Sequence, residues 1–151
     1  MAQWNDFATA EPDFSRRVLE LFTTQKHMTM ATLRRDGSPR ISGTEAQFVD
    51  GELVLGMMPG SLKARDLLRD PRLALHSPSI DPPEGDPSAW GGDAKIAGVA
   101  VENFDKDPDD ESHRFVVDIR EVVLTKVGNP PDHLVIESWQ PDRGRRSRQR
   151  Y

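Results

Sequence analysis

The sequence predicts a mainly β protein, in which an antiparallel sheet closes fully or partly into a barrel flanked by two short helices. Two turn signals support this prediction, Asp36-Gly37 and Asp50-Gly51, because each separates two β-rich segments and is typical of a hairpin. Successive hairpins form an antiparallel meander, not a βαβ unit. A long meander would leave exposed edges, so we expect closure of the sheet or dimerisation.

Two helices are predicted. Apolar residues at helical spacing indicate the first over Phe14–Gln25, with Asp13 as its N-cap. The second is short: Ser61 is expected to cap it, and it ends near Leu68, before Asp70-Pro71.

Strands are predicted over the β-rich segments Met28–Leu33, Arg40–Val49, Glu52–Met57, Arg72–Ser77, Lys95–Phe104, Phe115–Val127 and His133–Trp139. The Pro- and Gly-rich stretch Pro78–Gly92 is predicted to be a loop, and a loop of this length is often a lid or a rim. The acidic stretch Asp105–Glu111 is expected to be solvated.

A length of 151 residues predicts a single domain over 1–151, with terminal tails at about 1–12 and 143–151. The absence of cysteine excludes disulfides, thiolate metal sites and a cysteine nucleophile. No apolar run is long enough for a membrane span and the N-terminus does not resemble a signal peptide, so a cytoplasmic protein without membrane contact is expected. The net charge of −5 argues against nucleic acid as a partner.

The segment Gly60-Ser61-Leu62-Lys63 has the composition of a phosphate site. A glycine lets the backbone approach a ligand, the helix that follows presents its positive dipole end, and Ser61 and Lys63 add a donor and a charge. Arg40 could add a forked guanidinium. Both features also have plainer explanations, an ordinary helix start with a surface lysine and a charge at a strand edge.

Other chemistry is less well supported. The four histidines lack metal-ligand spacing, and neither the hydrolase elbow nor the Rossmann glycine pattern occurs. Trp139 and the arginines after it could meet a planar anionic ligand, or the tryptophan could belong to the core or to a dimer interface. The C-terminal arginines are expected to form a solvated tail, and docking on an acidic partner is an alternative.

In combination, these segments resemble the pyridoxamine 5′-phosphate oxidase-like family of flavin-binding split barrels. The resemblance covers about residues 26–101. It lies in His27-Met28-Thr29-Met30-Ala31-Thr32-Leu33, Gly37-Ser38-Pro39-Arg40, Gly60-Ser61-Leu62-Lys63-Ala64 and Asp70-Pro71-Arg72-Leu73-Ala74-Leu75. The end of the chain, Glu137-Ser138-Trp139-Gln140, is similar to the C-terminus of the oxidase.

The resemblance implies a six-stranded antiparallel split β-barrel of Greek-key topology, and a homodimer that binds FMN in clefts at its interface. The positions that would bind the cofactor are Arg40, Ile41, Ser42, Gly43, Thr44, Glu45, Met57, Met58, Ser61, Lys63 and Trp139. Arg145 matches a substrate arginine of the oxidase, and Trp90, in the long loop, is expected at the rim of the cleft. No catalytic side chain and no metal ligand are predicted.

Departures from the oxidase pattern argue against pyridoxamine phosphate as the substrate. Leu62 replaces a basic residue beside the phosphate lysine, and Arg146-Ser147 follows Arg145 where the oxidase has Leu-His. The sequence therefore predicts a flavin-dependent oxidoreductase acting on another small molecule. Because short relatives bind the deazaflavin coenzyme F-420 in the same cleft, a deazaflavin-dependent reductase is one alternative. A flavin carrier or sensor without turnover, and an interaction dimer, are the others.

Overall fold

The structure, a computed structural model, describes residues 1–103 and 107–151. Its helices are α1 (Trp4–Ala10), α2 (Pro12–Phe22) and α3 (Leu62–Arg69), with a 3-10 turn η1 (Pro87–Ala89). Its strands are β1 (His27–Leu33), β2 (Pro39–Val49), β3 (Glu52–Met57), β4 (Arg72–His76), β5 (Asp93–Glu102), β6 (His113–Val127), β7 (Leu134–Gln140) and β8 (Gly144–Arg150).

Within the described residues, six strands close an antiparallel barrel in the order β3-β2-β1-β4-β5-β6, and β3 pairs with β6 to complete the ring. The first three strands form the predicted meander. The chain then crosses through α3, so that β4 pairs with β1 on the side away from β2. The spatial order β4-β1-β2-β3 is that of a Greek key, which confirms the predicted barrel topology.

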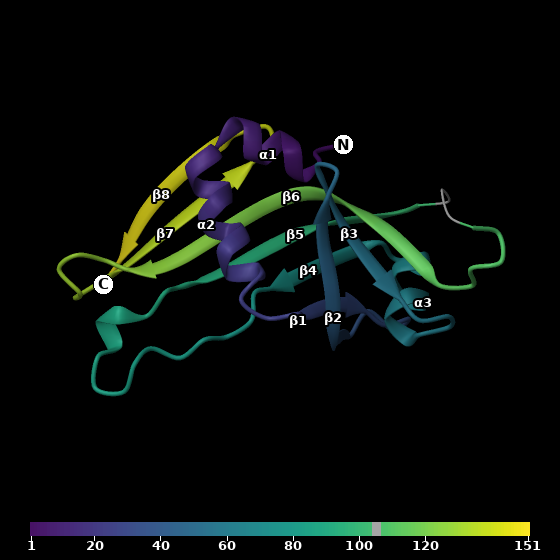
Figure 1. The fold of residues 1–151 in the computed structure, drawn as a ribbon, viewed down its shortest axis with the longest axis horizontal. Helices are drawn as coiled ribbons and strands as arrows, with labels where there is room; N and C mark the ends of the chain where they lie inside the picture. The colour runs from purple at the N-terminus through teal and green to yellow at the C-terminus, as the bar shows by residue number, and fades with distance from the viewer. Residues whose placement is uncertain (104–106) are drawn as a thin grey trace.

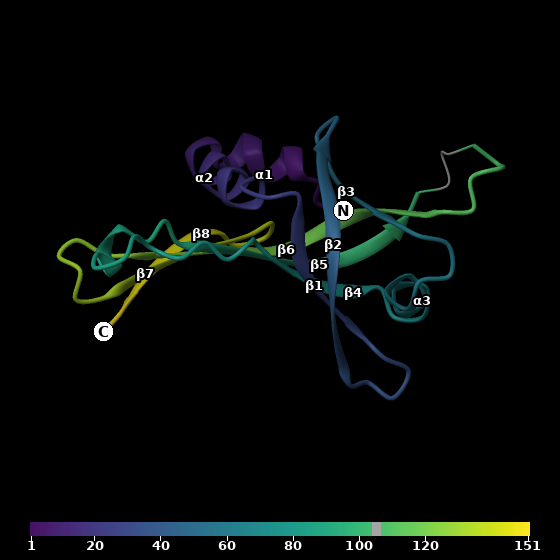
Figure 2. The same cartoon turned by 60° about the horizontal axis from the view of Figure 1, so that its bottom comes forward.

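A flat extension projects from the barrel because β6 is 15 residues long. The end of β6, from Val122 to Val127, leaves the barrel and pairs with β7, which pairs in turn with β8. Figures 1 and 2 show α1 and α2 lying over one face of this extension, whereas α3 lies at the other end of the molecule, beside the barrel.

The core lies inside the barrel and continues beneath the two N-terminal helices. Alternate residues of β6, Phe115, Val117 and Ile119, point inward and are fully buried or nearly so. A bulge between Ala97 and Gly98 shifts the register of β5 against β6. Under the helices the core is aromatic, and the rings of Phe7 and Trp139 lie 5.0 Å apart.

The ends of the chain differ from the prediction. The segments 1–12 and 143–151, expected as tails, form α1 and β8, and the helix expected over Phe14–Gln25 begins at Pro12 and ends at Phe22. Phe104, at the end of a predicted strand, and the start of the acidic stretch at Asp105 lie outside the described residues. None of the described helices is long and apolar enough to cross a membrane.

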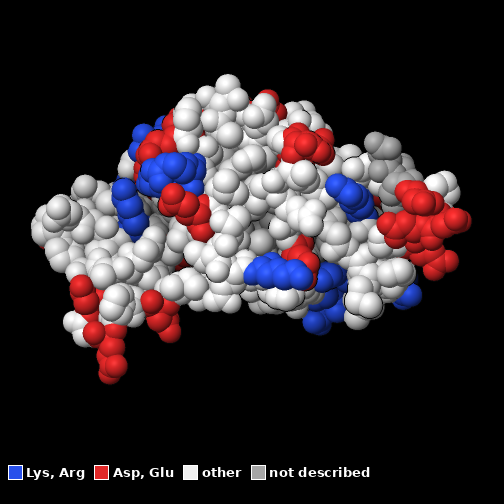
Figure 3. Space-filling model, in the orientation of Figure 1, with Lys and Arg blue, Asp and Glu red and all other residues white. Residues whose placement is uncertain are grey.

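Acidic side chains gather at both ends of the face seen in Figure 3, over the loop between β5 and β6 and over the loop that precedes β5. The residues concerned are Asp107, Asp109, Asp110 and Glu111 in the first loop, and Asp81, Glu84 and Asp86 in the second.

Candidate functional site

A groove of about 670 Å³ lies on the outside of the barrel, where β2, β3 and the start of β6 meet the N-terminal end of α3. Seven of the predicted cofactor residues line it: Gly43, Thr44, Glu45, Met57, Met58, Ser61 and Lys63. They come from three elements that are separated in sequence. The fold therefore brings most of the predicted site into one place.

The floor of the groove is open because two glycines face it. Gly43 on β2 and Gly56 on β3 both line the groove, and a Cβ added at either would meet no atom within 4 Å. Strand alternation places Glu45 and Gln47 on the same outer face of β2 as Gly43. A flat group could thus lie directly against the backbone of these strands.

One end of the groove is formed by the turn into α3. Gly60 adopts a φ of +68°, a conformation that favours glycine, and Ser61 caps the helix by accepting a hydrogen bond from the Ala64 N–H at 3.4 Å. Lys63 reaches across to β2, where its Nζ donates to the carbonyl oxygen of Gly43 at 2.7 Å. A helix start, a hydroxyl and an ammonium group therefore lie together, as predicted from the sequence.

Arg40 does not line this groove. Its Nε donates to Oδ2 of Asp66 on α3 at 2.7 Å, and it lines a separate depression together with Arg65 and Arg69. Asp66 is buried and also accepts hydrogen bonds from Thr32 and Arg69. Burial raises the pKa of Asp66, but the hydrogen bonds from Arg40, Thr32 and Arg69 outweigh this effect and leave the pKa below its ordinary value.

The two predicted residues next to Arg40 also lie off the groove. Ile41 is 75% exposed on the outer face of β2, and Ser42 is half-buried. Within one chain, neither residue lines the groove.

Trp139 lies in the core of a single chain, under α1 and 5% exposed. On the same face of the extension, Arg145 donates to Glu137, and its guanidinium lies 6.0 Å from the centroid of the Phe14 ring. Glu137 also accepts two hydrogen bonds from Arg17 of α2, at 2.6 and 2.9 Å. The hydrogen bonds from Arg17, and after them the one from Arg145, lower the pKa of Glu137 to about 2 in spite of its burial.

The loop that contains Trp90 lies at the end of the molecule opposite to α3 (Figure 1). Pro87 and Ser88, just before Trp90, line a depression together with His133 and Tyr151. Within one chain this loop does not line the groove and so does not form the predicted rim.

Sequence reasoning missed the β6 side of the groove. His113 accepts a hydrogen bond at Nε2 from the Gly60 N–H at 3.3 Å, and Arg114 pairs with Gly56 across β3 and β6. Nothing local in the sequence indicates this pairing, because it depends on closure of the barrel. His27, on β1, also lines the groove, and its Nε2 lies 3.1 Å from a carboxylate oxygen of Glu45.

Solved structures with the same fold support the assignment of the barrel. PhzG from Burkholderia lata 383, in complex with tetrahydrophenazine-1-carboxylic acid, is 13% identical, with a TM-score of 0.67 over 99% of this chain and 96% of that one. A pyridoxamine 5′-phosphate oxidase-related, FMN-binding protein from Nostoc punctiforme PCC 73102 is 10% identical, with a TM-score of 0.65 over 100% and 98% of the two chains. An F-420 reductase is 15% identical, with a TM-score of 0.52 over 68% and 93%.

Identities this low establish the fold alone, and a search of the curated proteins finds no match to this chain. The family is shown by a sequence profile, described as pyridoxamine 5′-phosphate oxidase, which matches residues 14–136. Since this match spans most of the chain and the barrel agrees with it, the chain belongs to the pyridoxamine 5′-phosphate oxidase family.

Proposed function

We propose that this protein is a flavin-dependent oxidoreductase that binds FMN in the groove beside α3 and acts on a small molecule other than pyridoxamine phosphate. The observation that supports the proposal best is the convergence of residues from β2, β3 and α3 on one groove, with Lys63 and the start of α3 at its end. Cofactor sites have volumes of about 300–1,000 Å³, and the groove, at about 670 Å³, lies within that range.

The residues present fit both parts of the cofactor. Ser61, Lys63 and the start of α3 would hold the phosphate, because they offer a hydroxyl, a positive charge and backbone N–H groups. The open floor at Gly43 and Gly56 would accept the flat ring system. Arg40, whose charge is paired with Asp66, would not contribute to this phosphate site within one chain.

FMN, when bound, supplies hydride-transfer chemistry. The chain would contribute binding, orientation and partial exclusion of water. We assign no side chain as a general acid or base.

A deazaflavin-dependent reductase is the alternative, and one observation favours it. Leu62, at the start of α3, is 56% exposed, and it leaves the helix start with one positive charge fewer than in the oxidase pattern. The likeness of the fold to an F-420 reductase is consistent with this alternative. A flavin carrier or sensor is a further possibility, which differs only in lacking turnover.

Separate titrations of the protein with FMN and with F-420, followed by absorbance and fluorescence, would test the proposal. We expect micromolar binding of FMN. Lys63→Gln should weaken it about tenfold, since it removes one charge-assisted hydrogen bond. Lys95→Gln, which changes an exposed lysine on β5, is the matched control and should leave the affinity unchanged.

Micromolar binding of neither cofactor would refute the proposal, and tighter binding of F-420 would favour the deazaflavin alternative. Steady-state oxidation of the reduced cofactor by candidate acceptors then separates an enzyme from a carrier, because a carrier would show binding without turnover.

A further inference from the structure

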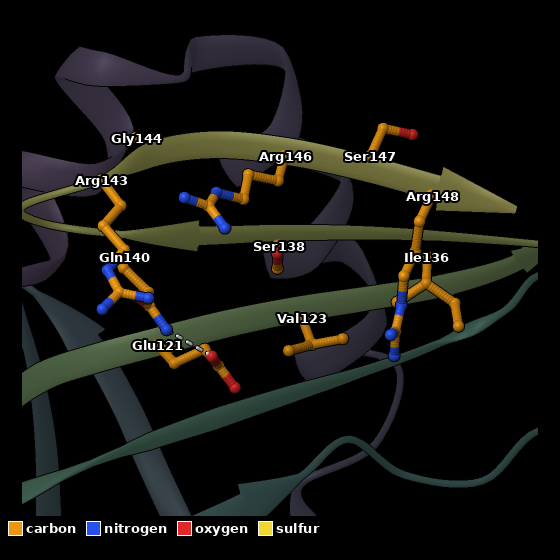
Figure 4. Close-up of a pocket in the computed structure, with 10 residues that line it drawn as sticks. All are labelled: Glu121, Val123, Ile136, Ser138, Gln140, Arg143, Gly144, Arg146, Ser147 and Arg148. Carbon is orange, nitrogen blue, oxygen red and sulfur yellow. Dashed lines mark hydrogen bonds between the residues drawn. The ribbon is translucent and has the colours of Figure 1, made fainter.

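A second groove, of about 420 Å³, lies on the face of the extension that points away from α1 and α2. Val123 of β6 and Ile136 of β7 form its half-buried apolar floor, with Ser138 beside them. Strand alternation explains this arrangement, because Glu137 and Trp139 point towards the helices and Ser138 therefore points away from them. In Figure 4 the helices lie behind the sheet and the groove faces the viewer.

Three arginines of the C-terminal hairpin line this groove. Figure 4 shows Arg146 over β7 near Ser138, Arg148 extended towards Ile136, and Arg143 beside Gln140. Arg146 and Arg148 are two residues apart on one strand, so their side chains leave the same face about 7 Å from each other.

The charges of these arginines are not compensated. Within the described part of the chain, the guanidinium groups of Arg143, Arg146 and Arg148 have no hydrogen bond or ion pair. The nearby carboxylate of Glu121 accepts a hydrogen bond from Nε2 of Gln140 at 2.7 Å. Seven other arginines do hold carboxylates: Arg16, Arg17, Arg40, Arg69, Arg72, Arg120 and Arg145.

A bound anion would offset the repulsion between these arginine charges. Like charges on one face of a strand repel each other, and the rest of the chain is acidic, with a net charge of −5 overall. A guanidinium donates two parallel hydrogen bonds to a phosphate or a carboxylate, so neighbouring arginines can hold a doubly charged group. The apolar floor requires that the ligand also have an apolar body.

We propose that this groove binds a small organic anion that has an apolar body and either a phosphate or a pair of carboxylates. The body would lie on Val123 and Ile136, and the anionic group between Arg146 and Arg148. Glu121, at the other end, would face a hydrogen-bond donor of the ligand. The lining residues all differ from those of the groove beside α3, so the proposal does not depend on the flavin.

A nucleic-acid strand fits this surface less well. Single-stranded binding surfaces combine basic side chains with aromatic rings on which bases stack. The described residues that line the groove include no aromatic side chain. We therefore favour a small ligand over a polymer.

The probe for the test is 1-naphthyl phosphate, which has an apolar body and a phosphate. Its binding is followed by fluorescence and calorimetry, on the wild-type protein with one equivalent of FMN per chain and on the FMN-free Lys63→Gln variant. We expect saturable binding of one probe per chain in both cases. Arg146→Gln/Arg148→Gln should weaken it at least tenfold. The control, Arg34→Gln/Arg35→Gln, removes the same charge from an exposed turn and should have no effect.

Thermal unfolding of each variant confirms that it is folded. Three results would overturn the proposal: no saturable binding, an equal loss in both double variants, or displacement of the probe by a single equivalent of FMN per chain. Displacement by FMN would place the probe in the flavin groove. Failure of FMN itself to bind would refute the proposed function but not the proposed anion site, because the measurement on Lys63→Gln does not need the flavin.

Discussion

Glu137 joins α2, β7 and β8, and its replacement by glutamine tests whether this ion cluster stabilises the fold. The carboxylate is 2% exposed and accepts hydrogen bonds from Arg17 and Arg145, with Lys126 at 3.8 Å. Glu137→Gln keeps the size of the side chain but removes its charge. It would leave three cations without their common anion.

The size of the effect follows from the pKa of Glu137, which falls from 4.5 to about 2. Each pKa unit corresponds to about 1.4 kcal/mol, so the charged form contributes about 3 kcal/mol. Breaking a buried ion pair typically costs about 3–5 kcal/mol, which agrees with the value derived from the pKa. Because the pKa is depressed in the folded state, this contribution is complete above about pH 5.5 and is lost as the pH falls through 4.5 towards 2.

Urea unfolding of the wild type and of Glu137→Gln at pH 7 and at pH 3 measures this contribution. We expect a difference of about 3 kcal/mol in the free energy of unfolding at pH 7, narrowing to about half that value at pH 3. Glu20→Gln removes an exposed partner of Arg16 and should cost less than about 1 kcal/mol. A difference below about 1 kcal/mol for Glu137→Gln, or one that is the same at both pH values, would refute the reasoning.

Two further substitutions test the packing of the barrel and the open floor of the groove. Gly98→Ala would place a Cβ 2.4 Å from the carbonyl oxygen of Asp118. Thermal and urea unfolding should therefore show that the free energy of unfolding falls by about 2 kcal/mol or more. The control is Gly91→Ala, where the added Cβ meets open space and the free energy of unfolding should hardly change. Gly56→Leu should leave the fold stable but fill the groove, so FMN titration should show an affinity at least tenfold weaker. An unchanged affinity would mean that the flavin ring does not lie on this floor.

The parts of the fold that are set by local chemistry were predictable. Both Asp-Gly turns place glycine at positive φ, +84° at Gly37 and +76° at Gly51, and β3 has its predicted bounds, Glu52–Met57. The capped start of α3 was equally local. These features depend on neighbouring residues, which the sequence displays directly.

Features that depend on distant pairing were not predictable. The residues of β8 suggest a charged tail, yet they form a strand because the edge of β7 offers hydrogen bonds. The pairing of β3 with β6 brings His113 and Arg114 to the groove. Arg40 instead donates a hydrogen bond to Asp66, which lies 26 residues further along the chain, and so does not line the groove. The residue pattern of a single segment does not indicate contacts with distant segments.

The exposed apolar residues around the groove lead us to propose that a second subunit packs there. Ile41 on β2 is 75% exposed and Met58, just after β3, is 78% exposed, and the groove is open to solvent in one chain. A second barrel packed on this face would bury these side chains and enclose the flavin ring. We therefore expect Ile41→Asp to weaken dimerisation and FMN binding together, as followed by analytical ultracentrifugation with and without FMN. Val49→Asp, which charges the far end of the same strand, should change neither. A monomeric Ile41→Asp protein that binds FMN with wild-type affinity would show that one chain is sufficient for the site.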